Sequence, residues 1–205
     1  MEKTSYLIYG GGKHSRVVIS VLEKNGIEVV GLFDADNNTK STNKIPFLGN
    51  YNSQIFPKFK LVIAIGDNSI REKVSQKIKH PIGKIIDFDS RISKDVSIGE
   101  GSQIITSSTV NVGTTIGKHC IINTNCSIDH DCKVSDFVHI APGATICGGV
   151  SIGKSTLVGA GATILPNIMV GKNVIIGAGA LVNKNISDDA KVFGVPAKII
   201  DDGKE

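Results

Sequence analysis

An isoleucine or valine recurs at every sixth position through the second half of the chain, and this period constrains the fold more than any other feature. The run contains sixteen positions without an insertion: Ile92, Ile98, Ile104, Val110, Ile116, Ile122, Ile128, Val134, Ile140, Ile146, Ile152, Val158, Ile164, Val170, Ile176 and Val182. If these two residue types make up about a fifth of a chain, chance produces such a run with a probability of about 0.2 to the sixteenth power. The sequence therefore contains a structural repeat of six residues.

A period of six excludes an α-helix and an amphipathic strand, because those repeat every 3.6 and 2 residues. It is typical of a parallel β-helix, in which each hexapeptide supplies one short strand and one corner. Three hexapeptides close one triangular turn of about eighteen residues, so the run predicts about five turns. The aliphatic side chains point into the prism, where each stacks on its equivalent one turn later, and stability comes from that stacking.

The composition agrees with an aliphatic lattice. Aromatic residues make up 5% of the chain and tryptophan is absent, so aliphatic side chains have to fill the core. Glycine is frequent, with 23 of 205 residues, and it often directly follows the repeated aliphatic position, as at Gly99, Gly117 and Gly153. Glycine at that position indicates either a positive φ or a close approach of two backbone segments.

The charge and hydropathy patterns exclude two classes of partner. Lysine and arginine total 23 and aspartate and glutamate total 19, and the resulting net charge of +4 is not gathered into a basic stripe. We therefore expect no nucleic-acid partner. No apolar run approaches the length of about 18 residues that a spanning helix needs, so we expect no membrane insertion. The polar first residues lack a secretory signal, which predicts a cytoplasmic protein.

Residues 1–88 lack the repeat and are predicted to form a Rossmann-like α/β domain, ahead of a β-helix domain over residues 89–205. Apolar runs at 7–9, 29–33 and 61–65 indicate three strands, and apolar residues at helical spacing over 17–22 indicate a helix. Alternating strands and helices form a parallel sheet, which binds ligands at the carboxyl ends of its strands. Those ends carry the glycines of 10–12, His14, Asp34, Asp36 and Asp67.

The turn after the first predicted strand contains a partial dinucleotide-binding fingerprint. Gly10 and Gly12 stand at its first two glycine positions, and Ser15 replaces the third glycine. Such glycines let the backbone approach a phosphate at the start of a helix. Asp34, about twenty residues later, is placed to accept a hydrogen bond from a ribose or a base. The alternative interpretation is a purely structural strand-to-helix turn.

Besides His14 at the end of the first predicted strand, two of the five histidines are predicted to be functional. His130 lies between Asp129 and Asp131, two residues after an inward isoleucine, and so need not point into the prism. A carboxylate that binds one ring nitrogen raises the basicity of the other, which favours His130 as a general base. His139 is a candidate for ligand binding. His80, which precedes a proline in a basic segment, is expected at the surface.

Three cysteines six residues apart occupy the small inward slot of successive hexapeptides. They are Cys120, Cys126 and Cys132, and we expect them to be buried thiols on three different faces. A disulfide framework is not expected in a chain without an export signal. Zinc held by three histidines, as in the β-helical carbonic anhydrases, is an alternative, although the histidine spacing of those enzymes is not present. The histidines in question are His119, His130 and His139.

The whole chain resembles the hexapeptide-repeat acetyltransferases that N-acetylate a nucleotide-linked 4-amino-dideoxy sugar, together with the related sialic acid O-acetyltransferases. Four stretches carry the resemblance: Tyr9–Ser15, Ile63–Asn68, Asn123–His139 and Gly194–Lys198. The last stretch is a frequent ending of hexapeptide acetyltransferases. The resemblance implies a left-handed β-helix and acetyl-CoA as the co-substrate. It also implies a homotrimer that binds acetyl-CoA in the groove between adjacent β-helices.

The resemblance further implies roles for individual residues. His130 corresponds to the proton acceptor and Asp131 to the acidic residue that increases its basicity, with Asp129 as a competitor for that role. The acetyl-CoA site is formed by His139 and by backbone groups at Gly148, Ala160 and Ala178, and the Gly148 amide faces the developing oxyanion. The nucleotide of the sugar is held by Gly12, Lys13, His14, Asp34 and Gly66. No metal ion is implied.

We therefore expect an acetyl-CoA-dependent N-acetyltransferase that acts on a UDP- or GDP-linked 4-amino-4,6-dideoxy sugar in bacterial surface glycan synthesis. In the expected reaction the sugar amine attacks the thioester directly, His130 accepts a proton from the amine, and backbone N–H groups stabilise the oxyanion. One alternative is O-acetylation of a sialic acid or a related sugar. Another is a non-enzymatic β-helix used as a scaffold, which predicts no affinity for acetyl-CoA.

Overall fold

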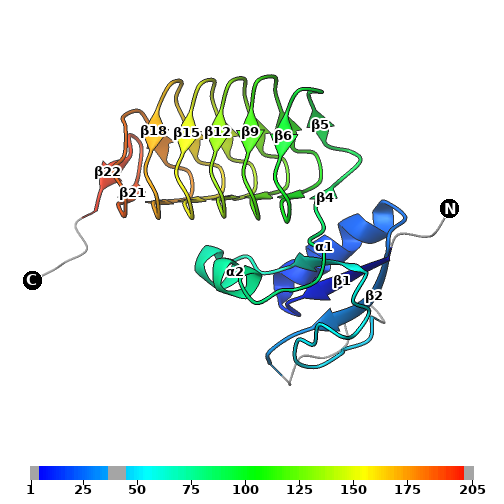
Figure 1. Cartoon of the computed structure of the whole chain (residues 1–205). Helices are drawn as coiled ribbons and strands as arrows, with labels where there is room; N and C mark the ends of the chain where they lie inside the picture. Colours follow the sequence, from blue (N-terminus) through cyan, green and yellow to red (C-terminus); the bar gives the residue numbers. More distant parts are fainter. Residues whose placement is uncertain (1–4, 37–44, 201–205) are drawn as a thin grey trace, which may run out of the picture.

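The computed structural model describes residues 5–36 and 45–200, which form a small α/β unit and a parallel β-helix (Figure 1). The α/β unit has a three-stranded parallel sheet with the order β2-β1-β3. Its elements are β1 (Ser5–Tyr9), α1 (Lys13–Lys24), β2 (Glu28–Phe33), β3 (Lys60–Ile63) and α2 (Asn68–Ser75). This alternation confirms the predicted Rossmann-like unit. Within the described ranges, no helix has the length and hydropathy of a membrane span.

Helix α1 lies between the sheet and the β-helix. Its apolar residues repeat at helical spacing and are buried: Val18, Ile19, Val21 and Leu22. They pack in one cluster with Ile8 of the sheet and with Ile105 of the β-helix. The two units therefore share a hydrophobic core, and this core sets their relative position.

The strands of the β-helix form three faces, and each face collects every third strand. The first face contains β4 (Ile85–Ile86), β7 (Gln103–Ile104), β10 (Ile121–Ile122), β13 (His139–Ile140), β16 (Leu157–Val158), β19 (Ile175–Ile176), β21 (Lys191–Phe193) and the antiparallel β22 (Lys198–Ile199). The second face contains β5 (Arg91–Ile92), β8 (Thr109–Val110), β11 (Ser127–Ile128), β14 (Thr145–Ile146), β17 (Thr163–Ile164) and β20 (Leu181–Val182). The third face contains β6 (Ser97–Ile98), β9 (Thr115–Ile116), β12 (Lys133–Val134), β15 (Ser151–Ile152) and β18 (Met169–Val170).

The six-residue repeat sets the register of these strands, which confirms the predicted architecture. Ile122 pairs with Ile104 of the preceding turn and with Ile140 of the next, and the repeated aliphatic residues form one buried core. The β-helix has about six turns rather than about five, because its first turn begins at β4, before the first hexapeptide of the run. The last turn is shorter, since Ile175 pairs with Lys191, sixteen positions later instead of eighteen.

From Gly101 to Gly179, each corner of the prism has one residue in the left-handed backbone region. At the corner that leads from the second face to the third, called the second–third corner, these residues are Gly113, Asp131, Gly149 and Asn167. They are Ser107, Asn125, Gly143, Gly161 and Gly179 at the first–second corner. They are Gly101, His119, Phe137, Ser155 and Asn173 at the third–first corner. Glycine, asparagine and aspartate adopt this region most readily, which explains why they dominate these positions.

The glycines that directly follow the repeated aliphatic residues serve a different purpose. Gly99 and Gly153 do not adopt a positive φ. A side-chain carbon at Gly99 would lie 2.5 Å from the carbonyl oxygen of Gly117, and one at Gly153 would lie 2.5 Å from the backbone of Gly171. Of the two expectations for these positions, the close approach of backbone segments is right and the positive φ is wrong.

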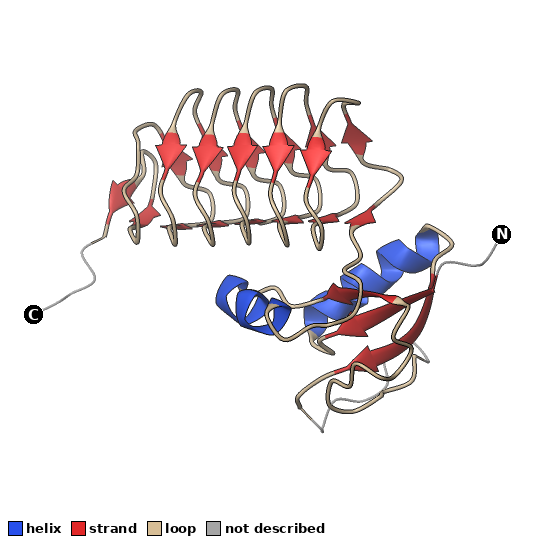
Figure 2. Ribbon diagram, viewed as in Figure 1, coloured by secondary structure: helices blue, strands red, loops and turns tan. Residues whose placement is uncertain are grey.

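The α/β unit covers the first face of the β-helix (Figure 2). Gln103 of this face donates from Nε2 to the Ile63 carbonyl at 2.8 Å, and His139 of the same face contacts the Gly66 carbonyl. In a triangular prism, the second–third corner lies opposite the first face. Residues at that corner therefore face away from the α/β unit.

His80 is buried rather than at the surface, which corrects the expectation for this residue. Its exposed fraction is 4%. Its Nδ1 atom lies 2.9 Å from the Tyr51 hydroxyl, and its Nε2 atom lies 2.9 Å from the Ile55 carbonyl oxygen. The segment that covers His80 precedes it by more than twenty residues, so the basic residues next to His80 in sequence give no sign of the burial.

Candidate active site

His130 stands at the second–third corner, between β11 and β12, with its side chain exposed to solvent. Its Nδ1 atom lies 2.9 Å from Oδ2 of Asp131. An ionised carboxylate only accepts hydrogen bonds, so Nδ1 carries the hydrogen and Nε2 is left as the basic atom. The hydrogen bond with Asp131, and then the charge of Asp129, raises the pKa of His130 above its usual value. The corner thus holds an oriented base.

The two aspartates beside His130 make different contacts. Asp129 accepts a hydrogen bond from the backbone amide of His130 at 2.8 Å and another from Nδ2 of Asn111 at 2.9 Å. Its carboxylate is therefore directed at the backbone and at the neighbouring turn. Asp131 is the residue that holds the imidazole ring, while Asp129 acts on the ring through its charge alone.

Gly148 stands one turn after His130 on the same corner. A side-chain carbon at Gly148 would lie 2.6 Å from Nε2 of His130, so the imidazole ring lies directly over this glycine. The Gly148 amide donates no hydrogen bond to any residue of the described ranges. The basic nitrogen, an uncommitted N–H group and the space left by the missing side chain thus lie next to one another.

His139 occupies a different environment on β13, at the first face. Its ring lies between the Gly66 carbonyl, 3.2 Å from Nδ1, and Nδ2 of Asn123, 3.1 Å from Nε2. The carbonyl can only accept, so Nδ1 donates and Nε2 accepts from the amide. Burial, followed by the charge of Arg71, lowers the pKa of His139 to about 4. The ring is neutral at physiological pH and suited to binding rather than to proton transfer.

The residues predicted to hold a nucleotide gather at the carboxyl edge of the small sheet. Gly12 is the N-cap of α1, Lys13 is the exposed first residue of that helix, and Gly66 follows β3. His14 contacts Oε1 of Gln103 on the β-helix at 2.9 Å. The Asp34 carboxylate accepts a hydrogen bond from the Gly11 amide and thereby shapes the glycine turn. This edge faces the first face of the β-helix.

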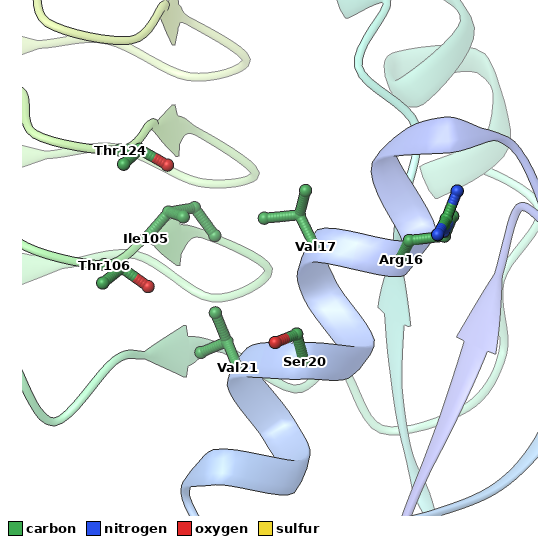
Figure 3. A pocket seen from close by; sticks show the side chains of 7 residues that line it. All are labelled: Arg16, Val17, Ser20, Val21, Ile105, Thr106 and Thr124. Atoms are coloured by element: carbon green, nitrogen blue, oxygen red, sulfur yellow. The ribbon is translucent and has the colours of Figure 1, made fainter. Parts of the chain in front are cut away.

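Two cavities lie where the α/β unit meets the β-helix. One has a volume of about 420 Å³ and lies between the loop after β3 and the first face. Its lining residues are Gly66, Asp67, Asn68, Ser69, His139, Ser155, Leu157, Asn173 and Ile175. The other has a volume of about 440 Å³ and lies between α1 and the first–second corner (Figure 3). Arg16, Val17, Ser20, Val21, Ile105, Thr106 and Thr124 line it, and the exposed Ala160 and Ala178 follow Thr124 along that corner.

The predicted site residues therefore form separate groups in one chain. His130, Asp131 and Gly148 lie at the corner opposite the first face. His139 and the predicted nucleotide residues lie at or against the first face, and Ala160 and Ala178 lie at the first–second corner. Of the groups predicted to bind the substrates, a single chain brings Gly148 next to the imidazole base, but not His139, Ala160, Ala178 or the predicted nucleotide residues.

The cysteines and the three candidate zinc ligands are also separated. Cys120, Cys126 and Cys132 are buried and precede strands of three different faces. Burial raises the pKa of the thiol to about 12 for Cys120 and to about 11 for Cys126. No three histidine, cysteine or acidic side chains within residues 5–36 and 45–200 come together as metal ligands. The zinc site on His119, His130 and His139 is thus not formed.

Several interface residues were not predicted from the sequence. Gln103, Asn123 and Arg71 each contact a predicted site residue or its loop. Gln103 and His139 share the outward position of first-face strands, so the repeat itself contained a signal for Gln103. Asn68 ends the Ile63–Asn68 stretch, whereas Arg71, one helical turn later in α2, belongs to none of the four stretches.

Comparisons with known proteins find two family models and a viral relative. Residues 6–78 match the family model described as the PglD N-terminal domain, and residues 149–184 match the bacterial transferase hexapeptide model of six repeats. An uncharacterized protein of Acanthamoeba polyphaga mimivirus is 36% identical over 117 residues. That match covers 51% of this chain, and the chain spans only 22% of the viral protein.

Solved structures match nearly the whole chain. A mutant of perosamine N-acetyltransferase from Caulobacter crescentus, in complex with CoA and GDP-perosamine, is 32% identical; 97% of each chain is covered and the TM-score is 0.93. The acetyltransferase domain of PglB from Neisseria gonorrhoeae is 30% identical over 96% of this chain and 100% of that chain, with a TM-score of 0.89. The same PglB domain has been solved with acetyl coenzyme A. WeeI from Acinetobacter baumannii is 27% identical over 96% of this chain and 100% of that chain, with a TM-score of 0.83.

Proposed function

The chain belongs to the hexapeptide-repeat acetyltransferases, a family of acyltransferases, and we propose that it transfers the acetyl group of acetyl-CoA to the amine of a nucleotide-linked 4-amino-4,6-dideoxy sugar. The observation that carries this proposal is the likeness, over 97% of both chains, to a perosamine N-acetyltransferase solved with CoA and GDP-perosamine. The nucleotide in our proposal is UDP or GDP, and the product belongs to surface glycan synthesis. The free cysteines fit the reducing cytoplasm, where we expect the enzyme to act.

The proposed chemistry uses the oriented base at the second–third corner. The amine nitrogen attacks the thioester carbon, and Nε2 of His130 accepts a proton from that nitrogen. Asp131 holds the ring by its other nitrogen and stabilises the imidazolium that forms. The Gly148 amide, which has no partner among the described residues, donates to the oxyanion of the tetrahedral intermediate. The C–S bond then breaks, the CoA thiolate leaves, and it takes up the proton.

We also propose that two copies of the chain complete each site, within a homotrimer. What supports this is the separation of the groups: the corner that carries His130 is opposite the face that carries His139 and the nucleotide edge of the α/β unit. A nucleotide sugar held at Lys13 and Gly66 of one chain is thus directed away from the base of that same chain. A neighbouring β-helix would supply the second–third corner, with acetyl-CoA in the groove between the two chains.

A thiol-release assay tests the proposed reaction. The purified chain is mixed with acetyl-CoA and, separately, with UDP- and GDP-linked 4-amino-4,6-dideoxy sugars, sialic acid and buffer alone. We expect thiol release with a nucleotide-linked amino sugar and an acetamido product by mass spectrometry. Release with sialic acid alone would favour O-acetylation. If the chain neither releases thiol with any acceptor nor binds acetyl-CoA, the result would favour the non-enzymatic scaffold.

A further inference from the structure

Arg71 of α2 is fully buried where the α/β unit meets the β-helix, and the proposed chemistry makes no use of it. All five of its N–H donors have acceptors. Nε donates to His119 O at 2.8 Å, Nη1 to Ile65 O and Gly66 O at 3.0 Å each, and Nη2 to Asn68 Oδ1 at 2.7 Å and Phe137 O at 3.0 Å. No carboxylate of the described ranges accepts from it, so carbonyl dipoles stabilise its charge.

The acceptors of Arg71 belong to two separate parts of the fold. The carbonyls of Ile65 and Gly66 lie in the loop after β3, which lines the 420 Å³ cavity and contains a predicted nucleotide-binding residue. The carbonyls of His119 and Phe137 lie at the third–first corner, on two consecutive turns of the β-helix. One guanidinium group therefore ties the substrate loop to two turns.

Asn68 extends this contact to a third turn. Its Oδ1 accepts from Arg71, while its Nδ2 donates to the carbonyls of Ser155 and Thr156 at 3.0 and 3.2 Å. Ser155 occupies the same left-handed corner position as His119 and Phe137. Helix α2 thus contacts three successive corner carbonyls spaced one turn apart. Displacing the helix along the corner would leave buried donors of Arg71 without acceptors, which is costly.

We propose that Arg71 is a positioning residue that fixes the height of the Gly66 loop along the β-helix, and with it the place where the nucleotide sugar is presented. The Gly66 carbonyl that accepts from Arg71 also accepts from the His139 ring, so the loop and the ring are held by one atom. Lysine cannot replace this arginine, because an ammonium group lacks two of the five donors and the planar fork. The kinetic test of this inference rests on the proposed function.

The kinetic test compares Arg71→Ala, Arg71→Lys and the control Glu72→Gln. Glu72 lies beside Arg71 on α2 and also contacts the third–first corner, through an ion pair with Lys154 and a hydrogen bond from Ser155 Oγ at 3.2 Å. Glutamine at this position keeps an oxygen that can accept from either group, while it removes the charge. In Arg71→Ala we expect the KM for the nucleotide sugar to rise about tenfold or more, while kcat changes less than about threefold, because the loop is displaced and the base is not. Added guanidinium ions should lower the KM of Arg71→Ala part of the way to the wild-type value. The KM of Arg71→Lys should stay above the wild-type value. Glu72→Gln changes both constants less than about twofold.

Hydrogen exchange gives a second readout that needs no substrate. We expect faster exchange of the amides at 65–69 in Arg71→Ala, with unchanged exchange in the turn at 121–138. Unchanged KM with unchanged loop exchange would overturn the inference, as would a loss of kcat alone or faster exchange throughout the chain. If the wild-type chain transfers acetyl to no acceptor, the proposed function fails, and the exchange result still decides the positioning role.

Discussion

Two histidines nine residues apart occupy opposite environments in the same β-helix. His130 has 55% of its side chain exposed at the second–third corner, where Asp131 raises its pKa. His139 lies beneath the α/β unit on the first face, where burial and then Arg71 lower its pKa to about 4. Nine residues are half of an eighteen-residue turn, so the two side chains lie on opposite sides of the prism. The repeat determines on which side of the prism each histidine lies. Asp131 at the corner and burial under the α/β unit then determine how readily each ring is protonated.

The two imidazole rings also differ in how many of their nitrogens are hydrogen-bonded. His130 has one nitrogen bound to a carboxylate and leaves the other free, next to Gly148. His139 has both nitrogens occupied, by the Gly66 carbonyl and by Asn123. A free basic nitrogen is required for proton abstraction, whereas a fully bonded neutral ring gives a fixed surface. The comparison is the reason why we propose proton transfer at the exposed corner and binding at the covered face.

Removing the imidazole at the corner is expected to have the largest effect. His130→Ala should lower kcat by about 10² to 10⁴-fold, the usual contribution of a general base. Initial-rate thiol-release assays measure the change in kcat directly, and light scattering checks that the oligomeric state is unchanged. Turnover at the wild-type rate would remove His130 from the mechanism and end the contrast between the two histidines.

Removing the orienting carboxylate is expected to have the next largest effect. Asp131→Asn should lower kcat/KM by about 10- to 100-fold, the size of effect seen when a metal-binding histidine loses its carboxylate partner. The base has to be neutral, and Asp131 stabilises the charged form, so wild-type activity is lost as pH falls through a pKa above the usual histidine value. In the variant this acid limb should move to lower pH. Asp129→Asn is the matched control: it removes a charge that also raises the pKa, so we expect the limb to move less and kcat/KM to fall less. An equal loss of kcat/KM there would assign the orienting role to both residues.

Filling the space at Gly148 is expected to have an intermediate effect. A methyl group would lie 2.6 Å from Nε2 of His130, so Gly148→Ala should displace the ring and lower kcat by about tenfold. Gly161→Ala supplies a control, since nothing lies within 4 Å of a side-chain carbon there, although its positive φ adds strain. An unchanged kcat in Gly148→Ala would show that catalysis does not depend on the present position of the His130 ring.

Substitution at the covered histidine is expected to have the smallest effect. His139→Gln should raise the KM for acetyl-CoA about two- to tenfold, because the loss of one of the ring's two internal hydrogen bonds disturbs the surface proposed to bind the co-substrate. The acid limb of kcat/KM should stay in place, because a group with a pKa of about 4 is neutral across the assayed range. Rate measurements from pH 5.5 to about 9 provide the check. A limb that moves in this variant would mean that His139 takes part in proton transfer.

The repeat predicted most of the fold because an uninterrupted period of six fits stacked β-helix turns and little else. It also placed Cys120, Cys126 and Cys132 inside, because their spacing puts them in equivalent inward slots. The repeat could not predict whether Asp129 or Asp131 binds the His130 ring, since both flank this histidine. Asp131 adopts a φ of 57° at the corner and binds the ring, while Asp129 binds Asn111, and these contacts depend on the folded turn.

Contacts between residues far apart in the chain could not be predicted from the sequence. Arg71 binds backbone carbonyls up to 66 positions away, and a carbonyl group has no signature in a sequence. His80 is buried by a segment more than twenty residues earlier. The sequence did predict which residues gather at the carboxyl edge of the small sheet, because strand ends in a parallel sheet share one edge. It did not predict that His14 would bind Gln103 of the β-helix.

Subunit complementation tests the central claim most directly, because the account requires a base from one chain and a nucleotide edge from another. His130→Ala and Lys13→Glu variants with different tags are each assayed alone, then unfolded, mixed in equal amounts and refolded together. We predict little activity for either alone and recovery of about a quarter of the sites in the mixture, since each site needs one intact half from each of two randomly paired chains. Mixed oligomers that co-purify through both tags yet stay as inactive as the parents would contradict the account.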